Sequence, residues 1–368
     1  MKFAFIIHPT SLEDVARYEP GAVGKGRPLI EKIMEWMPAY AAVHVTGVRA
    51  PDGRETEGWF VAAPFMPESM LALPRETVYR KILDAIAIGA ELGAEIAGLG
   101  AFTGVVGDAG ITLAERSPIA VTTGNSLTIA AGVESLLRGA REMEVEVARS
   151  TAVVVGATGS IGSACVELLA PHVARIVLCA RNRTRLERLV ESLRERVDCT
   201  LAISTDVREA VPQGQLVLTA TTSTQELIEP ADLQTGTVVC ELSLPHDVGR
   251  KVAIERPDVL VTEGGNMRVP GNPRFARVRE PGRDFDLGLP PGAALACMSE
   301  TMVLALENRR ENYTLGRGID LAKVREIDLL ARRAGFALDG MRAFDAAVTP
   351  EHVAATRAAA RERSATAV

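Results

Sequence analysis

A regular alternation of short β-branched segments with helical stretches begins near residue 148, and it restricts the fold more than any other feature of the chain. Six segments are strand candidates, at residues 151–155, 175–180, 201–204, 215–220, 237–241 and 258–262. Between the second and the third, residues 185–196 have one apolar helix face, formed by Leu186, Leu189, Val190 and Leu193. Strands that alternate with helices predict a doubly wound parallel sheet.

A glycine-rich turn follows the first of these strands directly. It consists of Gly156, Ala157, Thr158, Gly159, Ser160, Ile161 and Gly162, and residues 160–169 continue as a helix. Glycines allow a tight turn and a close backbone approach, and a helix N-terminus presents unpaired N–H groups to a pyrophosphate. A turn that only packs helix on strand is the alternative. The strand before it, the helix after it and the further β/α units favour a Rossmann dinucleotide site.

The residues after the second strand bear on the choice of dinucleotide. NAD sites usually place Asp or Glu there to bind the ribose 2′-hydroxyl, whereas this chain has Arg181, Asn182 and Arg183. A guanidinium pairs with a 2′-phosphate, so NADPH is favoured over NADH; solvated loop charges are the alternative. The topology also predicts that Ala220 and Thr221, after the fourth strand, lie beside the cofactor.

The rest of the chain suggests a two-lobed α/β protein. Strand-like segments at residues 3–7, 41–48 and 58–63, a helix over 74–96 and a linker helix over 127–142 predict an α/β or α+β lobe, which we take to be an α/β substrate lobe. Residues 266–292 hold five Pro, five Arg and four Gly, which predicts a long loop before helices over 293–309 and 321–334. We therefore expect four parts: a substrate lobe with its linker helix (1–148), an NADP-binding domain (149–265), a loop with C-terminal helices (266–345) and a partly frayed tail (346–368).

Composition argues against several classes of protein. The 41 Lys and Arg residues against 47 Asp and Glu give a net charge of −6, which offers no global basic field for nucleic acid or an anionic membrane. No apolar stretch approaches the roughly 18 residues of a spanning helix, and residues 3–7 are too short for a signal peptide. The five cysteines have no C-x-x-C spacing, so we expect no metal site, no disulfides and a cytoplasmic location.

One cysteine stands apart from the others. Four have positions typical of a small buried hydrophobe: Cys165, Cys179, Cys199 and Cys240. Cys297 instead follows the Pro-Pro-Gly break at residues 290–292, near the start of a helix. The partial positive charge of a helix N-terminus stabilises a thiolate, the nucleophilic form. Met298 and Met302 nearby indicate an apolar face and leave a core cysteine as the alternative.

Several segments in this order resemble a known family. They are HPTSLE at residues 8–13, LGAFT at 99–103, TTGN at 122–125, VGATGSIGSA at 155–164, ARN at 180–182, AC at 296–297 and NYTLGR at 312–317. The chain resembles the aldehyde-forming long-chain fatty acyl–acyl carrier protein reductases, cyanobacterial enzymes that supply fatty aldehyde, over most of residues 1–336. The TTGN segment and the late cysteine are the more specific pieces.

The resemblance implies a two-step reduction of an acyl thioester. Cys297 attacks the thioester, and NADPH reduces the enzyme-bound acyl group to an aldehyde. The substrate would be carried by acyl carrier protein or coenzyme A, and an aldehyde-consuming enzyme is an implied partner. The candidate residues at the acyl site are His8, Phe102, Thr103, Thr123, Gly124 and Asn125. A satisfied structural role for His8 and a core role for Phe102 remain open.

Other interpretations and weaker candidates also remain. One alternative is an NADP oxidoreductase akin to shikimate or amino-acid dehydrogenases, in which the thiol is inert; another is a non-enzymatic NADPH-binding sensor. His246, after the fifth strand, is a weak candidate for proton transfer. Five arginines are a candidate basic patch for an acidic carrier or the phosphates of coenzyme A, with solvated loop charge as the alternative: Arg268, Arg274, Arg277, Arg279 and Arg283.

Overall fold

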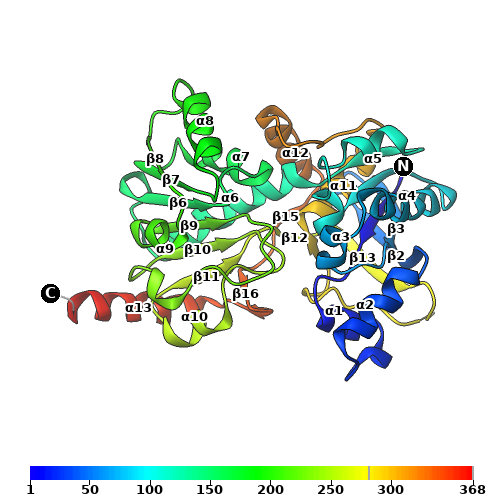
Figure 1. Ribbon diagram of the computed structural model, residues 1–368, viewed down its shortest axis with the longest axis horizontal. Helices are drawn as coiled ribbons and strands as arrows, with labels where there is room; N and C mark the ends of the chain where they lie inside the picture. The colour runs from blue at the N-terminus through cyan, green and yellow to red at the C-terminus, as the bar shows by residue number, and fades with distance from the viewer. Residues whose placement is uncertain (281, 367–368) are drawn as a thin grey trace. The chain divides into compact units, whose positions relative to one another are not determined.

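The computed structural model describes residues 1–280 and 282–366, which form two compact units (Figure 1). The first unit combines Met1–Leu127 with Met267–Ala337, and the second combines Thr128–Asn266 with Leu338–Val368. These boundaries differ from the predicted parts, because residues 267–337 join the N-terminal lobe and most of the linker helix joins the second unit. As a division by function, the predicted parts stay a prediction.

A six-stranded mixed sheet forms the centre of the first unit, in the order β13-β2-β3-β1-β4-β5. Its strands are β1 (Lys2–Ile7), β2 (Tyr40–Arg49), β3 (Glu55–Ala62), β4 (Ala94–Leu99), β5 (Ala120–Thr122) and β13 (Gly271–Arg277). β3, β1, β4 and β5 are mutually parallel, while β2 runs antiparallel to β3 and to the edge strand β13. The parallel strands therefore end at one edge of the sheet.

Helices cover both faces of this sheet. The helices of this unit are α1 (Leu12–Tyr18), α2 (Arg27–Trp36), α3 (Pro67–Ala72), α4 (Arg75–Glu91), α5 (Ile111–Arg116), α11 (Ala296–Leu306) and α12 (Leu321–Arg333), with short 3-10 turns η1 (Pro20–Ala22) and η2 (Ala101–Gly104). The apolar face of α4 packs on Ala4 and Ile6 of β1. On the other face α11 lies so close to β4 that a Cβ on Gly98 would be 2.1 Å from Thr301 Oγ1.

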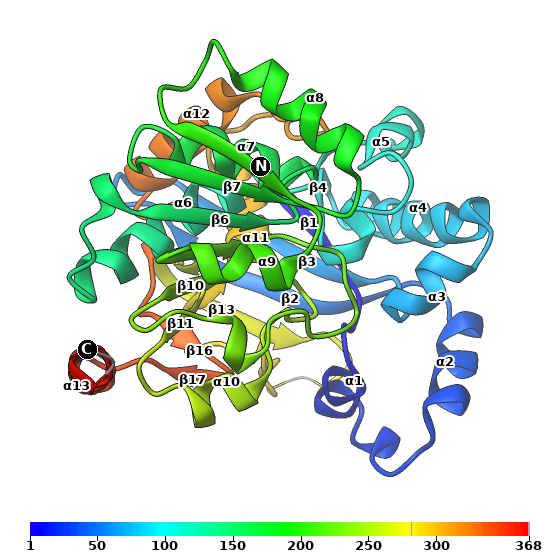
Figure 2. The same ribbon diagram turned by 60° about the vertical axis from the view of Figure 1, so that its left-hand side comes forward.

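The second unit contains a six-stranded parallel sheet in the order β11-β10-β9-β6-β7-β8. Its strands are β6 (Thr151–Val155), β7 (Arg175–Cys179), β8 (Thr200–Ser204), β9 (Leu216–Thr219), β10 (Val238–Glu241) and β11 (Leu260–Glu263). This order is the Rossmann order, with the reversal between β6 and β9. The predicted α/β fold with a doubly wound parallel sheet is confirmed, and Figure 2 shows the sheet from a second direction.

Helices lie on both faces of the second sheet as well. The helices of this unit are α7 (Ser160–Leu169), α8 (Arg183–Leu193), α9 (Val207–Ala210), α10 (Arg250–Glu255), α13 (Pro350–Thr366) and α6 (Asn125–Glu142), whose first residues belong to the first unit. The 3-10 turns are η3 (Val147–Arg149), η4 (Val211–Gln213) and η5 (Pro230–Asp232). Val153 and Val217 pack with Val252 of α10 on one face. On the other, α6 approaches so closely that Cys240 Sγ lies 3.4 Å from Gly132 O.

Smaller strands complete the structure. They form a three-stranded sheet in the order β14-β12-β15 and a two-stranded sheet of β16 and β17: β12 (Asn266–Arg268), β14 (Ala293–Leu295), β15 (Ala337–Leu338), β16 (Arg342–Ala343) and β17 (Ala346–Ala347). Among the described residues, no helix is both long and apolar enough to cross a bilayer.

Three expectations about local structure were wrong. The helix expected over residues 74–96 ends at Glu91, because Gly93 adopts a φ of +89° and the chain then enters β4. The loop expected over 266–292 contains β12 and β13, since an edge strand tolerates Pro273 at its register shift. The expected frayed tail forms α13 as far as Thr366; residues 367 and 368 lie outside the described part.

Candidate functional site

The predicted acyl-site residues gather at the carboxyl edge of the first sheet. His8 follows β1, Phe102 and Thr103 lie in η2 after β4, and Thr123, Gly124 and Asn125 follow β5. Because β1, β4 and β5 are parallel neighbours, these three segments lie at one edge. The sheet topology thus brings His8 to the same edge as segments that lie 94 or more residues later in the sequence. Their role in binding an acyl group stays a prediction.

Cys297 lies directly against this edge. It is the second residue of α11, and Gly124, with a φ of +74°, packs on its backbone: a Cβ on Gly124 would be 2.4 Å from both Cα and Cβ of Cys297. Only glycine fits this position, for reasons of both space and φ. Gly124 of the TTGN segment and Cys297 are therefore in direct contact within the first unit.

The electrostatics of the thiol differ from the expectation. The position near the N-terminus of a helix was expected to stabilise a thiolate, but burial outweighs that contribution and raises the pKa of Cys297 to about 12. The charge of nearby Glu300 raises this pKa further. Cys297 is a partly exposed, protonated thiol in this state, so its nucleophilicity depends on deprotonation.

A buried polar cluster lies beside the cysteine. The carboxyl group of Glu300, on α11, is fully buried and accepts hydrogen bonds from Thr122 Oγ1 at 2.5 Å, Leu127 N at 2.8 Å and Thr314 Oγ1 at 2.9 Å. Thr123 N in turn donates to Thr314 O at 2.9 Å. Three segments distant in sequence are thus fastened together one turn of helix away from Cys297.

His8 has both ring nitrogens in local hydrogen bonds. Its Nε2 accepts from Phe102 N at 3.0 Å, which leaves Nδ1 to donate to Pro9 O at 2.9 Å. Burial lowers the pKa of His8 to about 4, so the ring is neutral. Phe102 is buried, and the hydroxyl of the buried Thr103 donates to Gly100 O at 2.7 Å. This geometry favours the structural role that the sequence left open for His8 and Phe102.

The glycine turn of the second unit has the geometry expected of a dinucleotide loop. Gly156 has a φ of +85°, and a Cβ there would be 2.3 Å from Ala220 O. A Cβ on Gly162 would be 2.3 Å from Gly156 O. No side chain caps the first turn of α7, which begins at Ser160. The turn and the segment after β9 therefore meet at the point where the strand order reverses, the usual dinucleotide crevice.

The two arginines after β7 differ in whether an acidic side chain already pairs with them. Arg183 pairs with Glu187 one helical turn later at 3.0 Å, and both side chains are exposed. Asn182 caps α8, since its side chain accepts from Arg185 N at 2.9 Å. Arg181 is exposed at the end of β7. Of the two predicted arginines, Arg181 is thus the one without an ion pair that competes for its guanidinium in the described part of the chain.

A second buried polar cluster lies at the carboxyl ends of β9 and β10. Thr221 donates from its hydroxyl to Asp247 at 2.7 Å, and Ser243 donates to the same carboxyl group at 2.5 Å. Burial raises the pKa of Asp247. Burial disfavours the imidazolium of His246, yet Glu241, 3.2 Å from its Nδ1, raises the pKa of His246 overall. This cluster adjoins the predicted cofactor residue Thr221.

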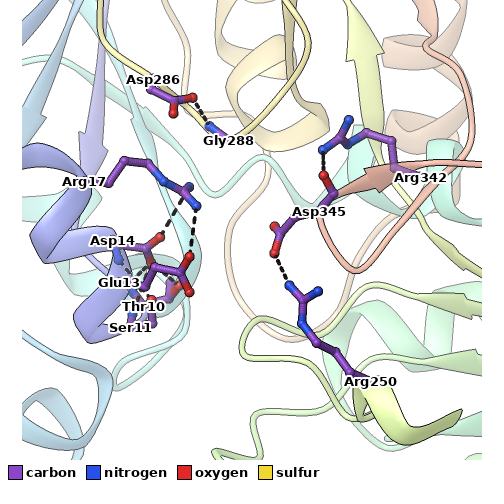
Figure 3. A network of polar contacts seen from close by, with 10 residues as sticks. All are labelled: Thr10, Ser11, Glu13, Asp14, Arg17, Arg250, Asp286, Gly288, Arg342 and Asp345. Carbon is purple, nitrogen blue, oxygen red and sulfur yellow. Dashed lines mark hydrogen bonds and ion pairs between the residues drawn. The ribbon is translucent and has the colours of Figure 1, made fainter. Parts of the chain in front are cut away.

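The candidate basic patch is largely paired with acids. Arg277 is buried beside Glu280, which also pairs with Arg283 at 2.8 Å, and Arg274 pairs with Asp284 at 2.9 Å. Figure 3 shows a neighbouring group in the first unit, in which Arg17 lies 3.8 Å from Asp14 and 3.9 Å from Glu13. The same view shows, in the second unit, Asp345 paired with Arg250 at 2.8 Å.

Comparison with known proteins bears on the second unit first. The family model described as Shikimate / quinate 5-dehydrogenase matches residues 139–261. The chain therefore has an NAD(P)-dependent oxidoreductase-type fold. The structure of shikimate 5-dehydrogenase from Listeria monocytogenes in complex with shikimate and NAD aligns with 89% of this chain and 95% of that chain, at 10% identity and a TM-score of 0.36.

Two curated relatives match nearly the whole chain. Long-chain acyl-[acyl-carrier-protein] reductase of Synechococcus elongatus is 27% identical over 356 residues, which is 91% of this chain and 98% of that protein. Aminotransferase PigE of a Serratia species is 32% identical over 349 residues, again 91% of this chain. The chain spans only 39% of the length of PigE. The chain is thus similar, at 27% identity, to one member of the family that its motifs resemble and, at 32% identity, to part of the longer protein PigE.

Sequence reasoning missed the buried acids. Glu300 was not a candidate, although it is the one charged residue in the apolar helix Ala296–Leu306, and a lone acid in such a helix is a recognisable signal. Glu241 and Asp247 were missed as well. No group of three or more His, Cys, Asp or Glu residues in the described part of the chain has the geometry of a metal site.

Proposed function

We propose that the chain reduces a fatty acyl thioester to the aldehyde with NADPH, through a thioester on Cys297. The observation that supports this most strongly is the packing of Gly124 on the backbone of Cys297, because it joins the two most specific pieces of the resemblance in one site. The similarity to the acyl carrier protein reductase of Synechococcus elongatus over 91% of the chain supports it independently.

The chemistry follows from the thiol and the carbonyl carbon. Cys297 Sγ forms a bond to the acyl carbon, the bond from that carbon to the carrier sulfur breaks, and the thiol proton leaves with the carrier. Hydride addition to the same carbon then breaks the bond to Cys297 Sγ and releases the aldehyde, and the thiolate takes a proton from solvent. Acyl carrier protein and coenzyme A are the two candidate carriers.

The second unit fits the nicotinamide cofactor that this reaction needs. Cβ atoms on Gly156 and Gly162 would lie 2.3 Å from Ala220 O and Gly156 O, so only glycines permit this tight turn at the start of α7, where a pyrophosphate would bind. Bound NADPH supplies the hydride. Arg181, at the end of β7 and without a competing ion pair among the described residues, is the residue we assign to the 2′-phosphate. Thr221 and Ala220 lie against the turn and would line the crevice.

A dehydrogenase without covalent catalysis is the second candidate. It is favoured by the match of residues 139–261 to the shikimate and quinate 5-dehydrogenase model and by the raised pKa of Cys297. In that case the protein would oxidise or reduce a small substrate directly, and the thiol would be a packing residue.

Intact-protein mass separates the two candidates. The protein is incubated with a fatty acyl–coenzyme A or acyl carrier protein donor in the absence of NADPH. We expect a mass increase equal to one acyl group in the wild type and in Cys199→Ala, a control that removes another partly exposed cysteine. We expect none in Cys297→Ala. Acylation that persists in Cys297→Ala, or a wild type that never acylates but oxidises a hydroxy acid, would refute the proposal.

A further inference from the structure

The helix that follows the TTGN segment is preceded by a glycine rather than by a residue with a capping side chain. α6 starts at Asn125, and the residue before it is Gly124, which has no side chain. A capping Ser, Thr or Asp at this position would place a Cβ 2.4 Å from Cys297. The close approach to the thiol therefore excludes the residues that usually satisfy the first N–H groups of a helix.

Glu300 supplies that cap from another helix. Its Oε2 accepts from Leu127 N, in the first turn of α6, at 2.8 Å. A carboxylate near a helix N-terminus is stabilised by the unpaired N–H groups and by the helix dipole. This accounts for a fully buried carboxyl group whose hydrogen-bond donors are hydroxyl and backbone N–H groups rather than a cation.

The second carboxyl oxygen connects Glu300 to the turn itself. Thr122 Oγ1 donates to Glu300 Oε1 at 2.5 Å and accepts from Gly124 N at 3.4 Å and from Thr314 N at 3.2 Å. A continuous path of contacts thus runs from Glu300 through Thr122 to Gly124, and Gly124 packs on Cys297. Because Cys297 and Glu300 share the first turns of α11, one helix both carries the thiol and fastens the segment that packs on it.

We propose that Glu300 is a positioning residue of the thiol site, which holds the Thr122–Gly124 turn against Cys297 by capping α6. This role rests on the proposed function, since positioning matters only if Cys297 receives the acyl group. Glu300 does not touch the acyl carbon in this assignment. It fixes the geometry of the thiol. Burial raises the pKa of the Glu300 carboxyl group, while hydrogen bonds from Thr122, Leu127 and Thr314 favour its ionised form; the carboxylate adds to burial in opposing formation of the thiolate.

The test compares two reactions of the same sulfur in Glu300→Gln. Reaction with iodoacetamide, followed by peptide mass between pH 7 and 10, reports how readily Cys297 ionises and is reached. Acyl transfer from acyl–coenzyme A, with kcat and KM separated, reports whether the thiol is held in a productive geometry. The titratable groups whose pKa values Glu300 raises are Cys297 and Tyr313. Glu307→Gln, at the end of the same helix, is the matched control.

We expect opposite changes in the two reactions. Loss of the negative charge should speed alkylation at pH 8 about three- to tenfold, while the loosened turn should lower kcat of acyl transfer by about tenfold or more, with KM and NADPH affinity little changed. A purely electrostatic role would speed both reactions. Two changes in the same direction, or no change in either, would overturn the proposal; Glu307→Gln should behave as the wild type in both.

Two further arms keep the outcome interpretable. Glu300→Ala removes the cap altogether, and its soluble form should show the same opposed pattern with a lower melting temperature; if it does not fold, Glu300→Gln decides alone. If the wild type transfers no acyl group, the proposed function fails and the positioning role fails with it. If the wild type transfers the group and Glu300→Gln keeps the wild-type kcat, the inference alone is refuted.

Discussion

Replacement of Gly124 by alanine tests whether the turn and the thiol form one unit. Gly124 adopts a φ of +74°, and an added Cβ would be 2.4 Å from Cα and Cβ of Cys297 and 2.7 Å from its carbonyl oxygen. The left-handed conformation costs about 1–2 kcal/mol for a residue with a side chain. Overpacking against backbone atoms that cannot rotate away adds about 1–3 kcal/mol. Gly124→Ala should therefore lose about 2–5 kcal/mol of unfolding free energy.

Gly53→Ala separates the two contributions. Gly53 has a φ of +90°, and an added Cβ there would meet nothing within 4 Å. It should lose only the conformational part, about 1–2 kcal/mol. Thermal unfolding measures the difference, at about 2–4 °C per kcal/mol for a unit of this size. Gly124→Ala should also slow acyl transfer by about a hundredfold, because a displacement of about 1 Å is enough for such a loss. Equal melting temperatures in the two variants, with unchanged reactivity of Cys297, would refute the reasoning.

Three further predictions concern charge and protonation. Arg181→Gln should weaken NADPH binding about tenfold in a fluorescence titration and leave NADH binding unchanged, whereas Arg183→Gln should have a smaller effect because Arg183 already pairs with Glu187. Since the pKa of Cys297 is about 12, its alkylation rate should keep rising to pH 10; a plateau below pH 9 would contradict this. Because the pKa of His8 falls from 6.5 to about 4 on folding, its contribution to stability is complete above pH 6.5 and is lost as the pH falls toward 4. Between pH 6.5 and 4.5, His8→Asn should therefore lose about 1–2 kcal/mol less free energy of unfolding than the wild type loses, after allowance for partial exposure. Equal slopes of melting temperature against pH in the two proteins would contradict this.

The doubly wound sheet was predictable because each of its strands and helices can be recognised from a short stretch of sequence. Thr151–Val155 is followed at once by the glycine turn and α7, and each later strand appears as a short β-branched run between helices. The right-handed crossover rule then limits the possible sheet orders, and the order itself is seen in the structure. The edge strand β13 was not predictable in this way. Its prolines and glycines read as loop, and only its pairing with β2, more than 200 residues earlier in sequence, makes it a strand.

The same distinction applies to the candidate site. Cys297 and the TTGN segment could be selected from the sequence, but their contact depends on the parallel arrangement of β1, β4 and β5 and on α11 packing across the sheet at Gly98. The protonation state of the thiol was misjudged for a related reason. A helix start is visible in sequence and favours the thiolate by a local dipole, whereas burial is a tertiary property and here dominates the pKa of Cys297.

Glu300 is visible in the sequence as an acid in an apolar helix, but the sequence does not show which groups hydrogen-bond to it. An acid in the middle of an apolar helix costs several kcal/mol to bury unless donors are waiting for it, so its presence in Ala296–Leu306 implies that some other segment supplies them. The sequence also contains a helix, α6, whose start has a glycine where a capping side chain is usual. From the sequence alone, the buried acid has no visible donor, and position 124 has no side chain that could cap the helix. The fold brings the two together, because Glu300 accepts from Leu127 N in the first turn of α6 while Gly124 lies against Cys297.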